Sequence, residues 1–119
     1  MKKTVVIGAS TDNSRYAYKA TRSLQNHKHE VIPVGINAGE INGIKIETEK
    51  KLIPDVDTVT MYVGPKNQPF WYNYILSLKP KRVIFNPGAE NSEFKKLLQQ
   101  NKIEVIEACT LVMLSTGQY

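Results

Sequence analysis

The chain has 119 residues, of which 41% are hydrophobic and 23% are charged, and its formal net charge is +5. This length suits one domain spanning residues 1–119, and this composition excludes a disordered or fibrous chain. Because the basic residues are scattered along the chain, they are typical of a solvated surface, and their positive field would favour a phosphorylated ligand rather than indicate nucleic-acid binding.

The single cysteine, Cys109, excludes a disulfide within the chain. The first residues do not resemble a signal peptide, and no apolar run approaches the ~20 residues that cross a bilayer. We therefore expect a cytoplasmic protein that does not enter a membrane.

The first predicted element is a strand over residues 4–7, a β-branched run that stops at Gly8, as a buried parallel strand does before a tight turn. Polar residues 10–14 then offer N-cap side chains. Apolar residues follow them at helical spacing, which predicts a helix over 14–26.

The second predicted strand covers 31–34 and contains Pro33, whose missing N–H suits a strand end or an edge position. Glycines punctuate 35–51, so this segment predicts a loop with an extended piece near 44–46. Residues 56–63 alternate between apolar and more polar side chains, which predicts a third strand.

A second helix is predicted over 67–78, where five side chains share one face that packs on the sheet. These side chains are Phe70, Trp71, Tyr74, Ile75 and Leu78. A fourth strand over 83–85 ends at an Asn-Pro-Gly turn, and the spacing of Phe94, Leu97 and Leu98 predicts a third helix.

A fifth strand over 103–106 and a final helical turn over 110–114 follow, and we expect 115–119 to fray. Strands and helices thus alternate with short connections. This alternation predicts an α/β, three-layer Rossmann-like fold, with a five-stranded parallel sheet and helices on both faces. Numbered along the chain, the strands are expected in the order 3-2-1-4-5.

The ligand site of such a sheet lies beyond the carboxyl ends of its strands. Gly8 lets the backbone approach a phosphate there, and the helix behind it offers free N–H groups, although a tight turn alone explains the glycine equally well. NAD binding requires further glycines in this loop and an acidic residue at the end of the second strand. The sequence has neither. We therefore expect a nucleotide-bearing ligand other than NAD.

Three side chains near this edge are candidates for the site. Arg15 could pair with a phosphate and Tyr16 could cover a base, while both fit a surface or packing role equally well. Cys109 follows the fifth strand, where the sequence is compatible with a reactive thiol or with a small packed side chain. Since no catalytic constellation and no set of metal ligands accompanies them, we expect a site that binds rather than reacts.

Seven segments stand out in order along the chain: VVIGAS (5–10), RY (15–16), VIPV (31–34), EING (40–43), VDTV (56–59), NPGAEN (86–91) and Cys109. As a set they resemble the small stand-alone CoA-binding domain proteins, which are related to the CoA-binding domain of the succinyl-CoA synthetase α-subunit. The resemblance covers nearly the whole chain. It implies coenzyme A or an acyl-CoA as the ligand.

The resemblance also implies roles for single residues. Residues 8–10 and Arg15 would hold the phosphates. The end of the second strand and residues 62–65 would line the side that binds the adenine and ribose, and residues 87–88 would form the remaining wall. With Tyr16 and Cys109 added, the predicted binding residues are Gly8, Ala9, Ser10, Arg15, Tyr16, Pro33, Val34, Gly35, Tyr62, Val63, Pro65, Pro87, Gly88 and Cys109. The chain departs from the family at 35–37, where Gly-Ile-Asn replaces the usual Asn-Pro.

The function expected from these observations is binding of coenzyme A or an acyl-CoA without chemistry of its own. Two alternatives stay open. One is a CoA-dependent acyl-transfer or thiol enzyme that uses Cys109. The other is a nucleotide-sensing interaction protein, which the charge of +5 supports.

Overall fold

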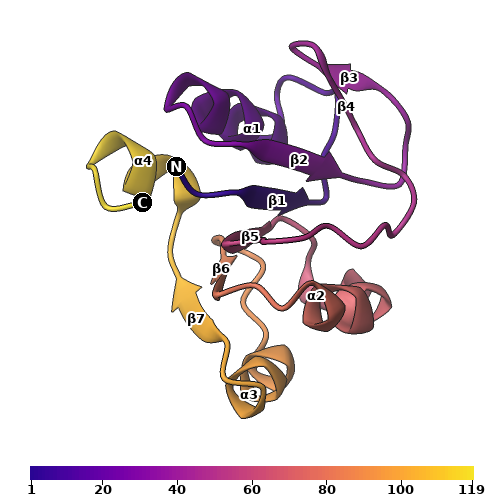
Figure 1. Cartoon of the computed structure of the whole chain (residues 1–119), viewed down its shortest axis with the longest axis vertical. Helices are drawn as coiled ribbons and strands as arrows, with labels where there is room; N and C mark the ends of the chain where they lie inside the picture. The colour runs from indigo at the N-terminus through magenta and orange to yellow at the C-terminus, as the bar shows by residue number, and fades with distance from the viewer.

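Five short segments pair as parallel strands, and helices pack on both faces of the resulting sheet (Figure 1). The computed structural model describes residues 1–119. The strands of the sheet are β1 (Thr4–Ile7), β2 (Val31–Val34), β5 (Thr58–Met61), β6 (Arg82–Phe85) and β7 (Glu104–Glu107). The helices are α1 (Tyr16–Asn26), the 3-10 helix η1 (Pro65–Trp71), α2 (Tyr72–Leu78), α3 (Ser92–Gln100) and α4 (Thr110–Ser115). The predicted three-layer Rossmann-like α/β fold is confirmed.

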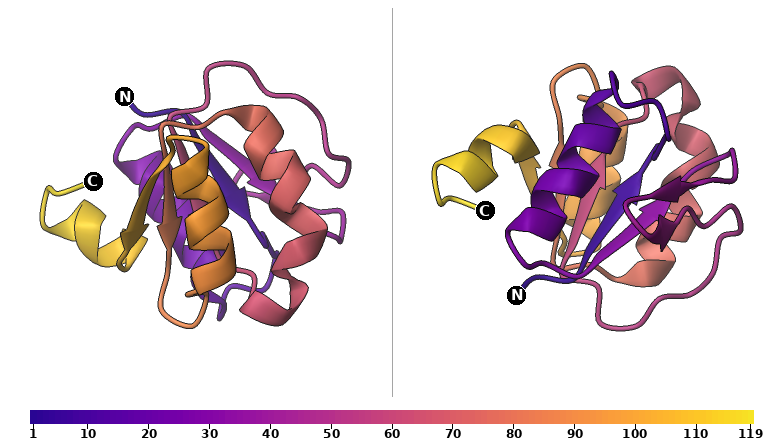
Figure 2. Two further views of the ribbon diagram at one scale, coloured as in Figure 1. Left: turned by 90° about the horizontal axis from the view of Figure 1, so that it is seen from below. Right: turned by 90° about the horizontal axis from the view of Figure 1, so that it is seen from above.

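The two faces of the sheet carry different helices, as the views from below and from above show (Figure 2). Val5 and Ile7 of β1 belong to a core shared with α2 and α3, whereas Val6 belongs to a smaller core shared with α1 and α4. The strands β1, β5 and β6 are buried along their full length. No helix combines the length and the apolar character that a bilayer crossing requires.

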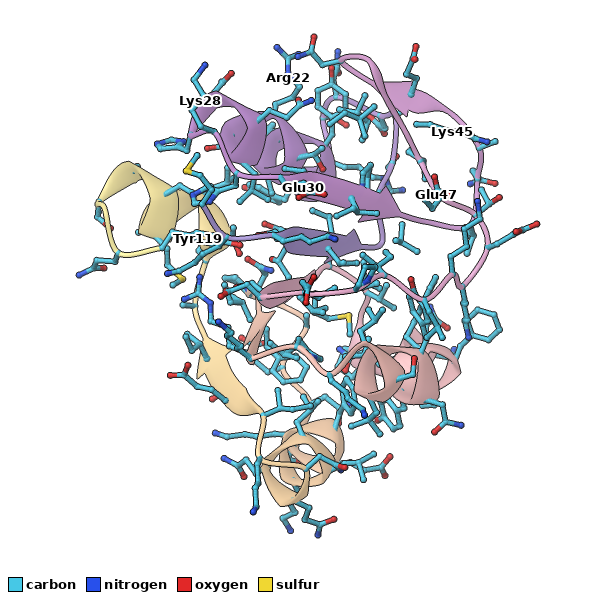
Figure 3. All side chains as sticks on the ribbon, viewed as in Figure 1. Arg22, Lys28, Glu30, Lys45, Glu47 and Tyr119 are labelled. Carbon is cyan, nitrogen blue, oxygen red and sulfur yellow. The ribbon has the colours of Figure 1, made fainter.

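The strand order is β2-β1-β5-β6-β7. Counted along the chain this is 2-1-3-4-5, so the strand at 58–61 lies between β1 and β6 and not outside β2, where the expected order 3-2-1-4-5 placed it. Pro33 gives the reason, because its carbonyl accepts the Glu47 N–H (2.9 Å) but it has no N–H to donate on that side of β2. Figure 3 shows Glu47 beside the end of β2. Beyond β2 there is only an isolated bridge between Val34 and Glu47, so β2 is an edge strand.

Two predicted elements differ in detail from the structure. The predicted loop after β2 contains a short hairpin of β3 (Glu40–Ile41) and β4 (Ile44–Lys45), and β4 matches the expected extended piece. The second helix begins as η1, a segment in which Pro65 and Pro69 lack the N–H groups that an α-helix interior uses. In this tighter winding Phe70 is 66% exposed, so its predicted place in the core is wrong.

The predicted fraying of 115–119 is also wrong, because Tyr119 folds back onto the sheet (Figure 3). Its hydroxyl shares a hydrogen bond with the Thr4 hydroxyl (2.5 Å), and the Arg82 guanidinium carbon lies 4.6 Å from its ring centroid. Arg82 is 8% exposed and donates to the Thr58 hydroxyl (2.7 Å). Because a buried cation needs polar or aromatic partners, Arg82 contacts both the Thr58 hydroxyl and the Tyr119 ring. The contacts with Arg82 and Thr4 hold Tyr119 in place.

His29 makes the stability of the fold depend on pH. Its Nδ1 accepts the Lys2 N–H (3.0 Å), so the neutral imidazole suits the folded state. Burial, together with the positive charges of the amino terminus, His27, Lys2 and Arg82, lowers the pKa of His29. Because the unfolded chain then binds a proton more readily, the contribution of His29 is complete above about pH 6.5 and is lost as the pH falls through the folded-state pKa.

We expect urea titrations to show a lower free energy of unfolding at about pH 5.5 than at about pH 7.5 in the wild type, and a smaller difference in His29→Asn. His27→Asn removes only one of the smaller causes of the shift and leaves the burial of His29 unchanged, so this exposed neighbour should keep most of the difference. If His29→Asn lost as much stability at low pH as the wild type, this role of His29 would be excluded.

Candidate ligand-binding site

Gly8, Tyr62 and Asn86 follow the carboxyl ends of the central strands β1, β5 and β6, so they meet at one edge of the sheet. A cavity of about 460 Å³, the smaller of two and here called the narrow cavity, opens at this edge beside the first residues of α1 and α4. The residues that line it are Gly8, Arg15, Tyr16, Ala17, Tyr62, Asn86, Pro87, Cys109 and Leu111.

A wide cavity of about 790 Å³ lies along the same edge, toward β2 and η1. The residues that line it are Gly8, Ala9, Ser10, Arg15, Ile36, Asn37, Tyr62, Val63, Gly64, Lys66, Asn67, Pro69, Phe70 and Trp71. Gly8, Arg15 and Tyr62 line both cavities. The two cavities therefore form one trough along the carboxyl edge of the sheet.

The charge of the trough suits an anion. Its lining contains no Asp or Glu, whereas Arg15 and Lys66 contribute positive charge. A third cavity, of about 730 Å³, lies at the opposite edge of the sheet. Its lining contains both lysines and the carboxylates of Asp55 and Asp57. Of these cavities, only those at the carboxyl edge are lined by cations and by no carboxylate.

The turn after β1 offers backbone donors, although not all of those expected. The N–H groups of Gly8 and Ala9 both donate to the Val34 carbonyl (2.9 Å each). The N–H groups of 10–11, and those of 16–18 in the first turn of α1, have no acceptor in the protein. A phosphate at this edge would therefore bind these free N–H groups, while Gly8 and Ala9 shape the turn.

Close packing explains the glycines at this turn and at the end of β2. Gly8 has a φ of +94°, and a Cβ there would lie 3.1 Å from Val63 Cγ2. A Cβ on Gly35 would lie 2.5 Å from the Ala9 carbonyl oxygen. Gly35 thus lets the chain after β2 touch the chain after β1.

Gly35→Ala is expected to lower the free energy of unfolding by about 1–3 kcal/mol, because the added methyl group must push the end of β2 away from the Ala9 carbonyl. Urea unfolding measures the change. Gly64→Ala is the matched control, since a Cβ at Gly64 meets no atom within 4 Å, and it should change the free energy by less than about 0.5 kcal/mol. Equal losses in both variants would contradict the packing argument.

Arg15, the N-cap residue of α1, lines both cavities and so lies where they join. Its Nε lies 3.7 Å from Asp12 Oδ2, and the two side chains are 69% and 52% exposed, so this ion pair is weak and can yield to a ligand anion. Hydrogen bonds from Ser14 lower the pKa of Asp12. Tyr16 is 66% exposed and forms the outer wall of the narrow cavity.

Asn86 forms the inner wall of the narrow cavity and is 2% exposed. Its side-chain amide donates to the Thr60 hydroxyl (2.7 Å) and the Met61 carbonyl (3.0 Å), and its side-chain oxygen accepts the Thr110 N–H (2.8 Å). One side chain thereby joins β5, β6 and α4. This places the half-buried thiol of Cys109, the N-cap residue of α4, in the cavity wall.

Tyr62 lines both cavities with its ring, while its hydroxyl is buried. The hydroxyl has no hydrogen-bond partner, because the nearby Thr60 and Thr110 hydroxyls bond to each other (2.7 Å). Burial raises the pKa of Tyr62 far above its usual value. The phenol therefore stays neutral and acts as a wall of the trough.

The other predicted site residues lie around the trough rather than in its lining. Pro33, Val34 and Gly35 are buried, and Pro65 and Gly88 are exposed beside it. Lining residues that the sequence did not single out for the site include Ile36, Asn37, Lys66, Phe70 and Leu111. The positions just after β2 and β5 could have indicated the first three, since ligands bind at strand ends, whereas Phe70 carries no such signal.

Comparisons with known proteins agree with this geometry. A family model described as a CoA binding domain matches residues 2–115. Among solved structures, an uncharacterized protein is 55% identical, with a TM-score of 0.98 over 100% of this chain and 98% of that one. The Thermus thermophilus protein ID.343 is 26% identical, with a TM-score of 0.86 over 99% of this chain and 91% of its own.

The same fold occurs within a larger enzyme. An acetyl-coenzyme A synthetase of Candidatus Korarchaeum cryptofilum matches 89% of this chain with 25% of its own, at 19% identity and a TM-score of 0.71. This match shows the fold alone. No curated protein matches the chain significantly.

Proposed function

Because this chain belongs to the CoA binding domain family, we propose that it binds coenzyme A or an acyl-CoA in the trough at the carboxyl edge of its sheet. The observation that carries the proposal is that the two cavities of the trough differ in volume and in the charge of their lining. A wide cavity with cations and no carboxylates leads past Arg15 into a narrow cavity whose one charged residue is Arg15. Coenzyme A has the same two parts, an anionic nucleotide and a slender, uncharged pantetheine arm.

In this proposal the nucleotide occupies the wide cavity and the pantetheine arm the narrow one. The diphosphate lies between them, against the Arg15 guanidinium and the free N–H groups of 10–11 and 16–18. The rings of Tyr16 and Tyr62 flank the arm, and its sulfur end lies near Cys109. These side chains bind and orient the ligand without supplying an acid or a base.

Calorimetric titration of the ligand-stripped chain with coenzyme A, NAD and ATP tests the proposal. Coenzyme A should bind with a Kd of about 1–100 μM, and NAD should bind much more weakly. The reason is that 35–37, after β2, read Gly-Ile-Asn and offer no carboxylate to hold the NAD ribose. Binding of NAD with no binding of coenzyme A would refute the proposal.

A second candidate function follows from the place of Cys109. Its thiol lines the narrow cavity, where it would meet the thioester of a bound acyl-CoA, so the acyl group could pass from the coenzyme sulfur to Cys109 Sγ as the coenzyme leaves with the thiol proton. Intact-mass spectrometry after incubation with acetyl-CoA would show one added acetyl group in the wild type and none in Cys109→Ala. An unmodified wild type would leave binding as the function.

A further inference from the structure

We infer that Phe70, Ile36 and Lys50 form the subsite that recognises the 3′-phosphorylated adenosine end of the ligand. The adenine lies against Phe70 and Ile36, and the ribose 3′-phosphate binds the Lys50 ammonium. The inference rests on the function proposed above, because it names the part of the trough that distinguishes coenzyme A from other adenine nucleotides.

Two exposed apolar side chains line the wide cavity. Ile36 is 78% exposed and Phe70 is 66% exposed, although both are large apolar residues, and both line this cavity. They come from separate elements, Ile36 from the loop after β2 and Phe70 from η1. Apolar surface that faces a cavity from two elements suits a flat, uncharged ring such as a nucleobase.

The ring of Phe70 is held in place by its neighbours. Trp71 is 5% exposed and meets Phe70 edge-on, with 5.4 Å between ring centroids. The Lys50 ammonium lies 3.6 Å from the Phe70 ring centroid and 5.2 Å from that of Trp71, and it donates a hydrogen bond to the Phe70 carbonyl. Phe70 is therefore a fixed platform in spite of its exposure.

Lys50 is a cation without a carboxylate partner. The neighbouring Lys51 pairs with Glu47 (3.3 Å), whereas Lys50 has no ion pair and faces the aromatic rings at the margin of a cavity that contains no Asp or Glu. An ammonium held in this way can bind an anion without first breaking a salt bridge. It lies beside the proposed base platform.

The distribution of cations matches the distribution of charge on coenzyme A. Arg15, at the junction of the cavities, is placed for the diphosphate. Lys50, beside Phe70, is placed for a phosphate close to the base, and the ribose 3′-phosphate is the one that coenzyme A has and its dephosphorylated form lacks. Lys50 should therefore determine the preference between these two ligands.

Calorimetric titration of the full chain with coenzyme A and with 3′-dephospho-CoA tests the inference. The wild type should bind coenzyme A about tenfold more tightly than 3′-dephospho-CoA. Lys50→Gln should lose this preference while its affinity for 3′-dephospho-CoA stays the same. Phe70→Ala should weaken both ligands by about tenfold, because both contain adenine. Lys51→Gln is the matched control and should behave as the wild type.

Two results would overturn the inference while leaving the proposed function intact. One is a wild type that binds coenzyme A and 3′-dephospho-CoA equally well, and the other is a Lys50→Gln variant that keeps the wild-type preference. Failure of the wild type to bind either ligand would overturn both the inference and the proposed function.

Discussion

Asn86→Ala is expected to lower the free energy of unfolding by about 2–4 kcal/mol. The substitution removes three hydrogen bonds of a side chain that is 2% exposed, and it leaves the Thr60 hydroxyl, the Met61 carbonyl and the Thr110 N–H without this partner. The unsatisfied buried N–H and the space left by the side chain both add to the loss. Urea unfolding followed by circular dichroism measures it.

The matched control is Asn73→Ala, at an exposed position of α2, which should change the free energy of unfolding by less than about 0.5 kcal/mol. A loss of similar size in both variants would show that Asn86 does not join β5, β6 and α4 in the way described. Because the Asn86 oxygen also holds the first N–H of α4, the same variant should expose Cys109 to alkylation more readily than the wild type.

Arg15→Ala is expected to weaken coenzyme A binding by about 10- to 100-fold, the effect of losing a hydrogen-bonded cation from a phosphate. Arg15 is the one charged residue that lines both cavities, so no other guanidinium or ammonium in the lining replaces it at their junction. The stability of the fold should not change, since the ion pair of Arg15 with Asp12 is exposed. Calorimetry measures the affinity and urea unfolding measures the stability.

Lys96→Ala, which removes an exposed cation on α3, controls for the change in net charge. It should leave the affinity for coenzyme A within about twofold of the wild type. If Arg15→Ala bound coenzyme A with wild-type affinity, the diphosphate would not bind at the junction of the cavities. The proposed placement of the nucleotide and the pantetheine arm in the two cavities would then be contradicted.

Most elements of the fold could be predicted because the strands of the five-stranded sheet are short runs rich in apolar residues, and all of them but β7 are followed within three residues by a glycine or proline. The place of the strand 58–61 could not be predicted from such runs, since a central strand and an edge strand can read alike. Pro33 indicates that β2 is the edge strand, because a strand whose proline has no N–H cannot donate that hydrogen bond to a further strand on that side.

The site was predictable in part, for a similar reason. Residues directly after strands, such as Gly8, Tyr62 and Pro87, do line the trough, because parallel strands bring their carboxyl ends to one edge. The hydrogen bonds from the Gly8 and Ala9 N–H groups to the Val34 carbonyl at the end of β2 could not be predicted from one sequence. Phe70 reads as a core residue by helical spacing, and only the 3-10 winding of η1 brings it to the cavity.

The central claim is that coenzyme A binds in the trough at the carboxyl edge, and a titration followed by amide NMR of the ¹⁵N-labelled chain tests it most directly. The largest shift changes should fall on the free N–H groups of 10–11 and 16–18 and on the amides of 36–37, 62–64, Lys66 and Cys109. No shift changes, or changes confined to 52–57 and 77–81 around the cavity at the opposite edge, would contradict the claim.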